Sequence, residues 1–197
     1  MDKIICVGKN YLKHAMELGD AIPEEPIYFL KPPSTIAKAQ GKIALPANGD
    51  LHHELELVFE IGRRGGDWMF TRFTIGLDLT LRNLQAHLKK SGQPWEKAKV
   101  FRNSIVLGEW RPVSSLEQAM NMPFSLKVNG EVRQQGVGRD MRWTPDWVLQ
   151  DLPKFFPLCE GDLLFTGTPE GVGPIKNGDV LRGECGEITW EFVATRD

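Results

Sequence analysis

Two glutamates separated by one residue give the clearest chemical signal in the sequence, in the segment 52–61 (HHELELVFEI). At a period of two residues its odd positions form an apolar face, and its even positions place His52, Glu54 and Glu56 on the opposite face. A β-strand with this pattern projects two carboxylates about 7 Å apart along the backbone, close enough for both to reach one cation. His52 can donate a hydrogen bond to a carboxylate that holds the cation.

A second alternating segment, residues 73–80, places Asp78 opposite another apolar face. If the two strands are neighbours, the three carboxylates converge on one cation site. The alternative is a half-solvated strand of an ordinary antiparallel sheet, which shows the same alternation. Glu54 and Glu56 have no Lys or Arg between them or immediately beside them, however, and a bound cation would relieve their mutual repulsion.

His14 and Glu17 stand three residues apart in a short predicted helix, residues 10–19, which ends at Gly19. A carboxylate beside an imidazole orients it and raises its pKa, so this pair can act as a general base. The alternative is a surface ion pair. Because flexible segments flank the helix, with Gly8 and Gly19 as candidate hinges, it is also a candidate lid over a substrate.

Arg82 and Gln85 lie three residues apart in a helix that is predicted to follow Asp78, with Thr80 as its N-cap and an end at 91–92. Both side chains fall in the first turns and therefore near Asp78. They can bind an anionic substrate there, or both can face the solvent.

Two further polar side chains stand in notable surroundings. Lys99 lies among apolar neighbours in the irregular segment 94–101, and a partly buried lysine needs a partner. Thr168 lies in the glycine- and proline-rich loop 166–174, which follows a buried strand. Such a loop brings backbone N–H groups and hydroxyl groups close to any ligand.

The composition excludes several classes of partner. The 197 residues suit one domain, and 24 basic against 26 acidic residues leave a net charge of -2, so neither a nucleic acid nor an anionic membrane is an expected partner. No apolar run approaches membrane-spanning length. The three cysteines lack a CxxC spacing and no signal peptide is present, which predicts buried, reduced structural thiols and a cytoplasmic location.

The remaining segments predict many strands and few helices. Residues 124–134 form the clearest hairpin, because the Asn129-Gly130 pair favours a type I′ turn. A helix is expected from about 144 to 156, with an interruption at Pro153.

Several short motifs follow one another along the chain: CVGKNY at 6–11 with His14 and Glu17, FLKP at 29–32, HELE at 53–56, Asp78 through Gln85, and TGTP at 166–169 with GVG at 171–173. Their order and spacing resemble the fumarylacetoacetate hydrolase family. The chain is most similar to the compact branch that contains acylpyruvate hydrolases, oxaloacetate decarboxylases and 2-hydroxyhepta-2,4-diene-1,7-dioate isomerases.

This resemblance implies a β-rich α+β fold, the mixed-sheet β-roll of the fumarylacetoacetate hydrolase C-terminal domain. Residues 1–197 are then one catalytic domain, with a short N-terminal helical lid around 10–19. Members of the family are usually homodimers, so a homodimer is expected.

The resemblance also implies roles by matching position. Mg²⁺ or Mn²⁺ would be held by three carboxylates: Glu54, Glu56 and Asp78. Catalysis falls to a water-activating pair and a lysine: His14, Glu17 and Lys99. Substrate binding falls to Arg82, Gln85 and Thr168. Oxygen ligands alone suit such a hard cation better than Zn²⁺, in agreement with the pattern of carboxylates.

The implied substrate is a small 2-oxo acid, either a β-diketo or a β-keto acid. Cleavage of its C–C bond, by acylpyruvate hydrolysis or oxaloacetate decarboxylation, gives a metal-bound pyruvate enolate. One alternative is a 2-hydroxyhepta-2,4-diene-1,7-dioate isomerase or decarboxylase of aromatic catabolism, which should prefer a longer dicarboxylate. A non-catalytic metal-binding homologue is another. A cupin-like site of His52, His53 and Glu56 is excluded, because adjacent strand residues point to opposite faces.

Three departures from the family pattern affect the expected pocket rather than the expected metal ligands. Lys9 stands where the family usually has Arg, which loses a bidentate donor. The segment 101–107 replaces a Cys-Pro-Val run, and Gly138 stands where Thr is common. The exact substrate therefore stays open.

Overall fold

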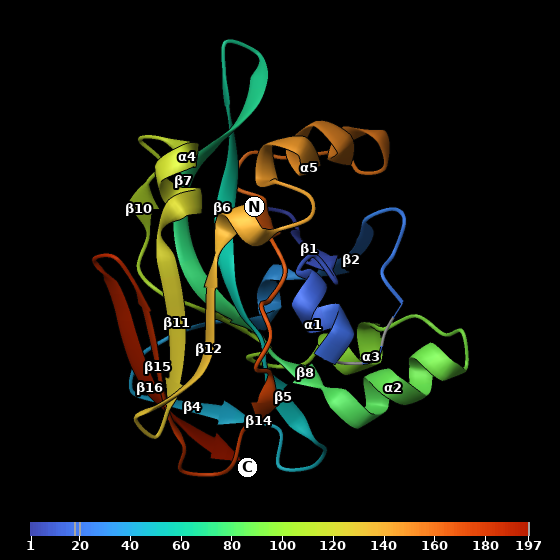
Figure 1. Ribbon diagram of the computed structural model, residues 1–197, viewed down its shortest axis with the longest axis vertical. Helices are drawn as coiled ribbons and strands as arrows, with labels where there is room; N and C mark the ends of the chain where they lie inside the picture. The colour runs from blue at the N-terminus through green and yellow to red at the C-terminus, as the bar shows by residue number, and fades with distance from the viewer. Residues whose placement is uncertain (18, 20, 197) are drawn as a thin grey trace.

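An eight-stranded mixed sheet forms the centre of the computed structural model, which describes residues 1–17, 19 and 21–196 (Figure 1). Its hydrogen-bonded order is β2-β1-β13-β6-β7-β9-β3, and β10 pairs with β7. The strands are β1 (Ile4–Gly8), β2 (Ile27–Lys31), β3 (Ile36–Lys38), β6 (Leu55–Arg64), β7 (Asp67–Asp78), β9 (Ile105–Leu107), β10 (Arg111–Pro112) and β13 (Leu163–Phe165). β1 runs parallel to β13 and β3 parallel to β9, and the other pairs are antiparallel.

Two smaller sheets complete the β-structure. A five-stranded sheet has the order β12-β11-β15-β16-β4, from Glu131–Val137, Pro123–Val128, Val180–Cys185, Ile188–Arg196 and Lys42–Leu45. A three-stranded sheet has the order β14-β5-β8, from Gly173–Pro174, Leu51–His53 and Thr80–Leu81. The predicted β-rich α+β class with mixed sheets is confirmed.

The helices are short and lie around the sheets. They are α1 (Leu12–Glu17), α2 (Arg82–Lys90), α3 (Glu96–Lys99), α4 (Leu116–Asn121) and α5 (Pro145–Asp151), with 3-10 turns at Pro33–Thr35, Gly138–Asp140 and Leu152–Lys154. Figure 1 shows α1, α2 and α3 gathered on one side, beside β8. Within the described part of the chain, no helix is long and apolar enough to cross a membrane.

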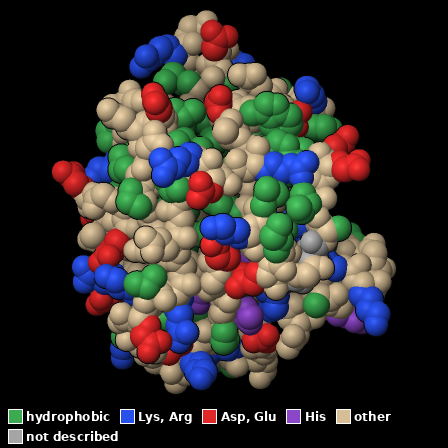
Figure 2. Space-filling view, viewed as in Figure 1, with side chains coloured by type: hydrophobic (Ala, Val, Ile, Leu, Met, Phe, Trp, Pro, Cys, Tyr) green, Lys and Arg blue, Asp and Glu red, His purple; other side chains and the backbone are tan. Residues whose placement is uncertain are grey.

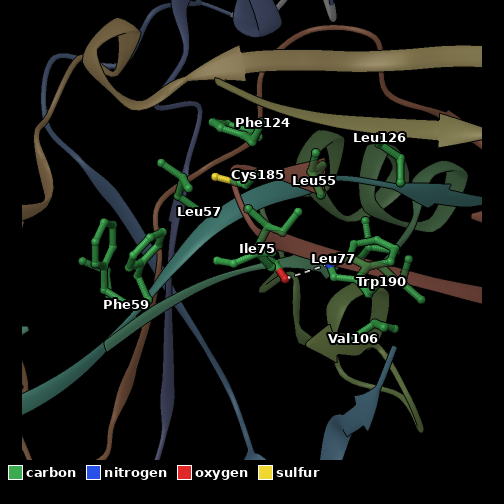
Figure 3. Packing of buried hydrophobic residues seen from close by; sticks show 14 of the residues in the cluster. Leu55, Leu57, Phe59, Ile75, Leu77, Val106, Phe124, Leu126, Cys185 and Trp190 are labelled. Atoms are coloured by element: carbon green, nitrogen blue, oxygen red, sulfur yellow. Dashed lines mark hydrogen bonds between the residues drawn. The ribbon is translucent and has the colours of Figure 1, made fainter. Parts of the chain in front are cut away.

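The apolar face of the carboxylate strand packs between the two large sheets (Figure 3). Leu55, Leu57 and Phe59 are fully buried there against side chains of the five-stranded sheet such as Phe124. Burying one such side chain contributes about 1.5–3 kcal/mol, so this face fixes the register of β6. Trp190 anchors the second sheet by donating from Nε1 to the backbone oxygen of Ile75 at 3.2 Å (Figure 3).

The opposite face of β6 is not half-solvated. Val58 is fully buried in a second cluster with Ile4, Cys6 and Phe165 from β1 and β13. Residues 55–59 of the strand are therefore buried on both faces, and the ordinary half-solvated-strand interpretation is wrong for Glu54 and Glu56, although Glu60 is partly exposed. Carboxylates on such a strand must find partners inside the protein.

β6 and β7 are antiparallel neighbours, and both strands are interrupted at the same level. Leu55 pairs with Leu77 and Glu56 with Gly76. β5 ends at His53 and β6 begins at Leu55, while β7 ends at Asp78 and β8 begins at Thr80. The chain positions between these strands keep their hydrogen bonds, as the Asp78 N–H donates to the Glu54 carbonyl at 2.9 Å. This pairing brings Glu54, between β5 and β6, beside Asp78 at the end of β7.

Several predicted elements are confirmed and two are corrected. Asn129 and Gly130 have φ values of 52° and 83°, as a type I′ turn requires, and the 144–156 helix divides into α5 and a 3-10 turn at Pro153. Thr80 is not an N-cap: it pairs with His52 in β8, and α2 begins at Arg82. The N-terminal helix spans Leu12–Glu17, and residue 18 of its predicted range lies outside the described residues.

All three cysteines are free thiols, but only two of them are buried. Cys6 and Cys185 are inside the core, whereas Cys159 is exposed, so the expectation of three buried thiols is wrong for Cys159. On the surface, Figure 2 shows basic and acidic side chains interspersed over the face it presents, as the balanced composition leads one to expect.

Candidate functional site

Three buried carboxylates converge where β6 and β7 end. Glu54, Glu56 and Asp78 each offer an oxygen within 4.8 Å of the others, and none of the three is more than 5% exposed. Glu54 occupies the break between β5 and β6, Glu56 lies in β6, and Asp78 is the last residue of β7. The expected convergence is therefore present, and the pairing of the two strands produces it.

Two buried lysines contact two of these carboxylates, Glu54 and Asp78. Lys99 Nζ donates to Glu54 Oε2 at 2.8 Å and to Asp78 Oδ2 at 2.6 Å. Lys31 Nζ donates to Asp78 Oδ1 at 2.7 Å and to the backbone oxygen of Ser104 at 2.9 Å. The partner that a buried Lys99 requires is thus the carboxylate cluster itself.

The two lysines differ in their electrostatic balance. Burial lowers the pKa of Lys99, but its contacts with Asp78 and Glu54 outweigh burial and raise the pKa above its ordinary value. Lys31 contacts one carboxylate, and burial prevails, so its pKa is lowered. A second carboxylate partner therefore decides how firmly each ammonium keeps its proton.

Among the contacts of the described residues, Glu56 is the carboxylate of the cluster without a lysine partner. Its Oε2 accepts a hydrogen bond from the Gly167 N–H at 2.7 Å. Burial and the neighbouring carboxylates of Asp78 and Glu54 raise the pKa of Glu56 well above its ordinary value. In contrast, Lys99 and Arg82 overcome burial and hold the pKa of Glu54 below its ordinary range. A cation between the three groups would remove the repulsion that acts on Glu56.

The donor set fits a divalent cation. All three groups offer oxygen, the ligand that Mg²⁺ and Mn²⁺ prefer, and these oxygens lie within 4.8 Å of one another. Each carboxylate oxygen carries two lone pairs, so one that accepts from a lysine can still bind a metal. The residues present could therefore hold such an ion.

Arg82 brings a further cation to the cluster from the first turn of α2. Its Nη2 forms an ion pair with Glu54 Oε1, and its Nη1 donates to Gln85 Oε1 at 2.8 Å. Its Nε is buried and has no hydrogen-bond partner in the part of the chain that the structure describes. Because an unpaired buried donor is costly, this N–H suits an acceptor supplied by a ligand.

The predicted general-base pair lies over the same cluster. His14 is buried, and its Nδ1 lies 3.2 Å from Glu17 Oε2. The Gly171 N–H donates to both carboxylate oxygens of Glu17, at 3.0 and 3.2 Å, and so ties α1 to the 166–174 loop. Burial lowers the pKa of His14 despite the carboxylates of Glu54 and Glu17, so the expectation of a raised pKa is wrong. A neutral imidazole whose Nδ1–H faces Glu17 keeps Nε2 as a proton acceptor.

Thr168 is held in a buried network that joins three parts of the fold. Its hydroxyl donates to the Leu55 carbonyl at 2.8 Å and accepts from Gln134 Nε2 at 2.7 Å. Gln134 Oε1 accepts from the Leu55 N–H at 3.0 Å and faces His53 Nδ1 at 2.9 Å. Leu55 lies between two of the three carboxylates, so Gln134 positions the strand that carries them.

The predicted site residues other than Glu17 all line one small cavity of about 30 Å³. Glu17 contacts His14, which is part of this lining. The lining includes the three carboxylates together with His14, Arg82, Gln85, Lys99 and Thr168. A single water needs roughly 10–15 Å³ of such space, so a small acid enters this cavity only when a side chain or α1 moves.

Sequence reasoning missed Lys31, Gln134 and the Gly167 N–H. Lys31 is the last residue of the apolar strand β2. A lysine in apolar surroundings was the signal that indicated Lys99, and the same signal could have indicated Lys31. Nothing in the sequence pattern indicated Gln134. The role expected for His52 is corrected: its Nε2 faces Asp50 at 3.2 Å, and its Nδ1 is buried without a partner.

Comparison with known proteins shows the family and agrees with the fold. Residues 3–191 match the family described as fumarylacetoacetate (FAA) hydrolase, C-terminal. The oxaloacetate tautomerase YcgM of Escherichia coli (strain K12) is 43% identical over 190 residues, which cover 92% of this chain and 87% of that protein. The mitochondrial oxaloacetate decarboxylase of Dictyostelium discoideum is 35% identical over 193 residues, covering 93% and 88%.

A solved structure with the same fold carries ligands. The crystal structure of fumarylpyruvate hydrolase from Pseudomonas aeruginosa in complex with Mn²⁺ and pyruvate has a TM-score of 0.91 and 33% sequence identity, and the match covers 99% of this chain and 90% of that one.

Proposed function

Because the chain belongs to the fumarylacetoacetate hydrolase family, we propose that it is a divalent-metal-dependent enzyme that interconverts the keto and enol forms of oxaloacetate. One observation carries this proposal: a carboxylate triad and a general-base pair meet at a single cavity, which also holds a buried arginine N–H without a partner. The similarity to YcgM supports the choice of substrate.

The residues divide the work by their chemistry. Glu54, Glu56 and Asp78 hold Mg²⁺ or Mn²⁺, which supplies a Lewis acid for the oxygens of a 2-oxo acid. Arg82 donates from Nε to a substrate carboxylate. Gln85 fixes the Arg82 guanidinium, and Thr168 shapes the opposite wall.

Proton transfer then falls to His14 and Lys99. His14 Nε2 accepts a proton from carbon 3 of the keto form, while Glu17 holds the other ring nitrogen and stabilises the imidazolium that forms. The buried Lys99 ammonium donates to Glu54, Asp78 and Thr80, and its positive charge stabilises the negative charge that develops on the oxygen of carbon 2. That oxygen then takes up the proton that His14 carries, so His14 is neutral again and the product is an isomer of the substrate.

Hydrolysis is the second candidate, and the likeness to fumarylpyruvate hydrolase favours it. The same His14 can take a proton from water, whose oxygen then adds to the distal carbonyl of an acylpyruvate. Cleavage of the adjacent C–C bond releases a carboxylic acid and pyruvate. Decarboxylation of oxaloacetate needs no water and can use the same cluster, as the similarity to the decarboxylase suggests.

Three further predictions accompany the proposal. The small cavity favours a short acid over the longer dienedioates, although isomerases of those compounds share the fold. The presence of the base pair argues against a non-catalytic homologue. A homodimer, a cytoplasmic location and the absence of nucleic-acid and membrane partners remain expectations of this proposal.

The test compares three reactions side by side. Metal-stripped protein is assayed with and without Mg²⁺ or Mn²⁺ for loss of the ultraviolet absorbance of enol-oxaloacetate, and for pyruvate release from oxaloacetate and from acetylpyruvate. The same metal without protein corrects for the spontaneous reactions, and Glu56→Ala is the control for the site.

We expect metal-dependent ketonisation that is faster than either release of pyruvate and that disappears in Glu56→Ala. Faster pyruvate release from acetylpyruvate would replace this proposal with hydrolysis, and faster release from oxaloacetate would replace it with decarboxylation. Failure of the protein to bind either metal would refute the role of the triad.

A further inference from the structure

The cavity has a buried end and a mouth. Four charged side chains at the buried end are at most 5% exposed: Glu54, Glu56, Asp78 and Lys99. The lining residues Lys9, Phe29 and Trp95 are partly exposed and mark the mouth. A 2-oxo acid that places its carboxylate and its keto oxygen at the carboxylate cluster therefore extends the rest of its carbon chain toward these three residues.

The backbone fixes the place of Trp95 relative to the cluster. Trp95 directly precedes α3, and its carbonyl accepts hydrogen bonds from the N–H groups of Ala98 at 2.8 Å and Lys99 at 3.2 Å. Trp95 and Lys99 are thus four residues apart on one turn of helix, a rise of about 6 Å along its axis. The turn that holds the Lys99 ammonium in the cluster also places the Trp95 indole at the mouth.

Three other elements hold the indole in place. Its ring centre lies 5.8 Å from that of Phe29 in β2, and the Lys89 Nζ of α2 lies 5.1 Å from the Trp95 ring. On the side of β1 the ring covers the backbone of Gly8, where an added Cβ would lie 3.4 Å from Cζ3 of Trp95. Rotation of the indole would break these aromatic and cation–π contacts, so the indole is a fixed wall rather than a mobile side chain.

The indole also fills the space that a longer acid needs. The cavity measures about 30 Å³, room for only a few water molecules. The apolar side chains that line it are Val7, Phe29 and Trp95, and the indole is the largest of them. Val7 is buried in the central sheet, whereas Trp95 stands at the mouth, where loss of the ring extends the cavity outward.

We propose that the Trp95 indole is the end wall of the substrate cavity and limits the chain length of the acids that this protein accepts. The inference rests on the proposed function and deepens it, because it assigns the selection of short acids to one side chain. Trp95 determines specificity and takes no part in proton transfer. Its replacement should therefore admit longer acids while the carboxylate cluster and the base pair stay in place.

The test uses two stable 2-oxo acids that differ only in length, 2-oxobutyrate and 2-oxohexanoate. Neither has a carbonyl group at carbon 4 or a carboxylate at carbon 3, so the site cleaves neither of them. Calorimetry with Mg²⁺-loaded protein measures the dissociation constant of each acid. The variants are Trp95→Ala, Trp95→Phe and, as the matched control, Trp147→Ala, which removes an exposed indole from α5.

We expect wild type and Trp147→Ala to bind 2-oxohexanoate more weakly than 2-oxobutyrate. Trp95→Ala should bind 2-oxohexanoate about tenfold more tightly than wild type does, the gain expected from burying two further methylene groups. Its affinity for 2-oxobutyrate should change by less than about threefold, and Trp95→Phe should change the affinity for 2-oxohexanoate in the same direction by a smaller factor. If circular dichroism shows that Trp95→Ala does not fold, Trp95→Phe decides by the direction of this change.

Three outcomes would overturn the proposal: equal affinity of wild type for the two acids, equal changes for both acids on replacement of Trp95, or the same gain in Trp147→Ala. A length preference that depends on Trp95 in a protein without tautomerase activity would support the end wall and refute the reaction. Tautomerase activity in a protein whose length preference does not depend on Trp95 would refute the end wall and leave the reaction standing.

Discussion

Replacing Lys31 with methionine tests how the buried cluster is stabilised. The substitution keeps an unbranched side chain of similar length and removes the ammonium that contacts Asp78 Oδ1 at 2.7 Å and the Ser104 carbonyl at 2.9 Å. Lys31 is fully buried, so no water replaces these contacts. The substitution leaves the opposite oxygen of Asp78 in contact with Lys99.

The expected loss follows from these distances. At an effective dielectric constant of 20, opposite charges 2.7 Å apart attract by about 6 kcal/mol. Removing the lysine also removes the cost of burying it, and breaking a buried ion pair typically destabilises a protein by about 3–5 kcal/mol. Because Lys99 continues to compensate Asp78, we expect the lower end of that range, about 3 kcal/mol.

Urea unfolding in the presence of EDTA, followed by tryptophan fluorescence, measures this change. Lys38→Met is the matched control, because Lys38 is an exposed strand residue whose replacement should change the unfolding free energy by less than about 0.5 kcal/mol. Saturating Mn²⁺ should restore part of the loss in Lys31→Met, by about 2.7 kcal/mol at a hundredfold excess over the dissociation constant. Equal stability of the two variants would refute the structural role of Lys31.

Three other predictions concern the base, the scaffold and the triad. Burial lowers the pKa of His14, and the base must be neutral, so kcat/KM should fall only as the pH drops below 6.5. Glu17→Gln removes a carboxylate that raises this pKa, so the fall should shift to still lower pH. A fall of kcat/KM centred above pH 6.5 would contradict the assignment of His14 as the base. Gln134→Ala leaves buried partners unsatisfied and should lower the free energy of unfolding in urea by about 3–5 kcal/mol. Gln135→Ala, at the exposed neighbouring position, is the control and should change it little. Equal effects of the two variants would argue against the network. Glu56→Gln should weaken Mn²⁺ binding more than tenfold by calorimetry, and an unchanged dissociation constant would exclude Glu56 as a ligand.

Much of the site could be predicted because its residues obey short periods. The alternation around Glu54, Glu56 and Asp78 placed all three opposite apolar faces, and pairing of the two strands then brings them together. The spacing of His14 and Glu17 likewise predicted their contact, which the structure contains at 3.2 Å. Local spacing is sufficient in these cases because the neighbours lie on one strand or one helical turn.

Other features depend on contacts between distant segments. Lys31 reaches Asp78 across 47 residues, and Gln134 reaches Leu55 across 79. Thr80 illustrates a direct conflict: its type favours an N-cap, but pairing with His52 across the three-stranded sheet holds it in a strand. No periodic pattern encodes such contacts, because they arise only when the sheets have assembled.

The sequence by itself determined which side chains stand opposite an apolar face, and therefore the carboxylate triad, the base pair and the β-rich class. The tertiary structure decided their electrostatic state. Burial, together with the neighbouring carboxylates of Asp78 and Glu54, raises the pKa of Glu56, and burial lowers the pKa of His14. Charge in a protein interior depends on every group within several ångströms, and only the folded chain brings those groups together.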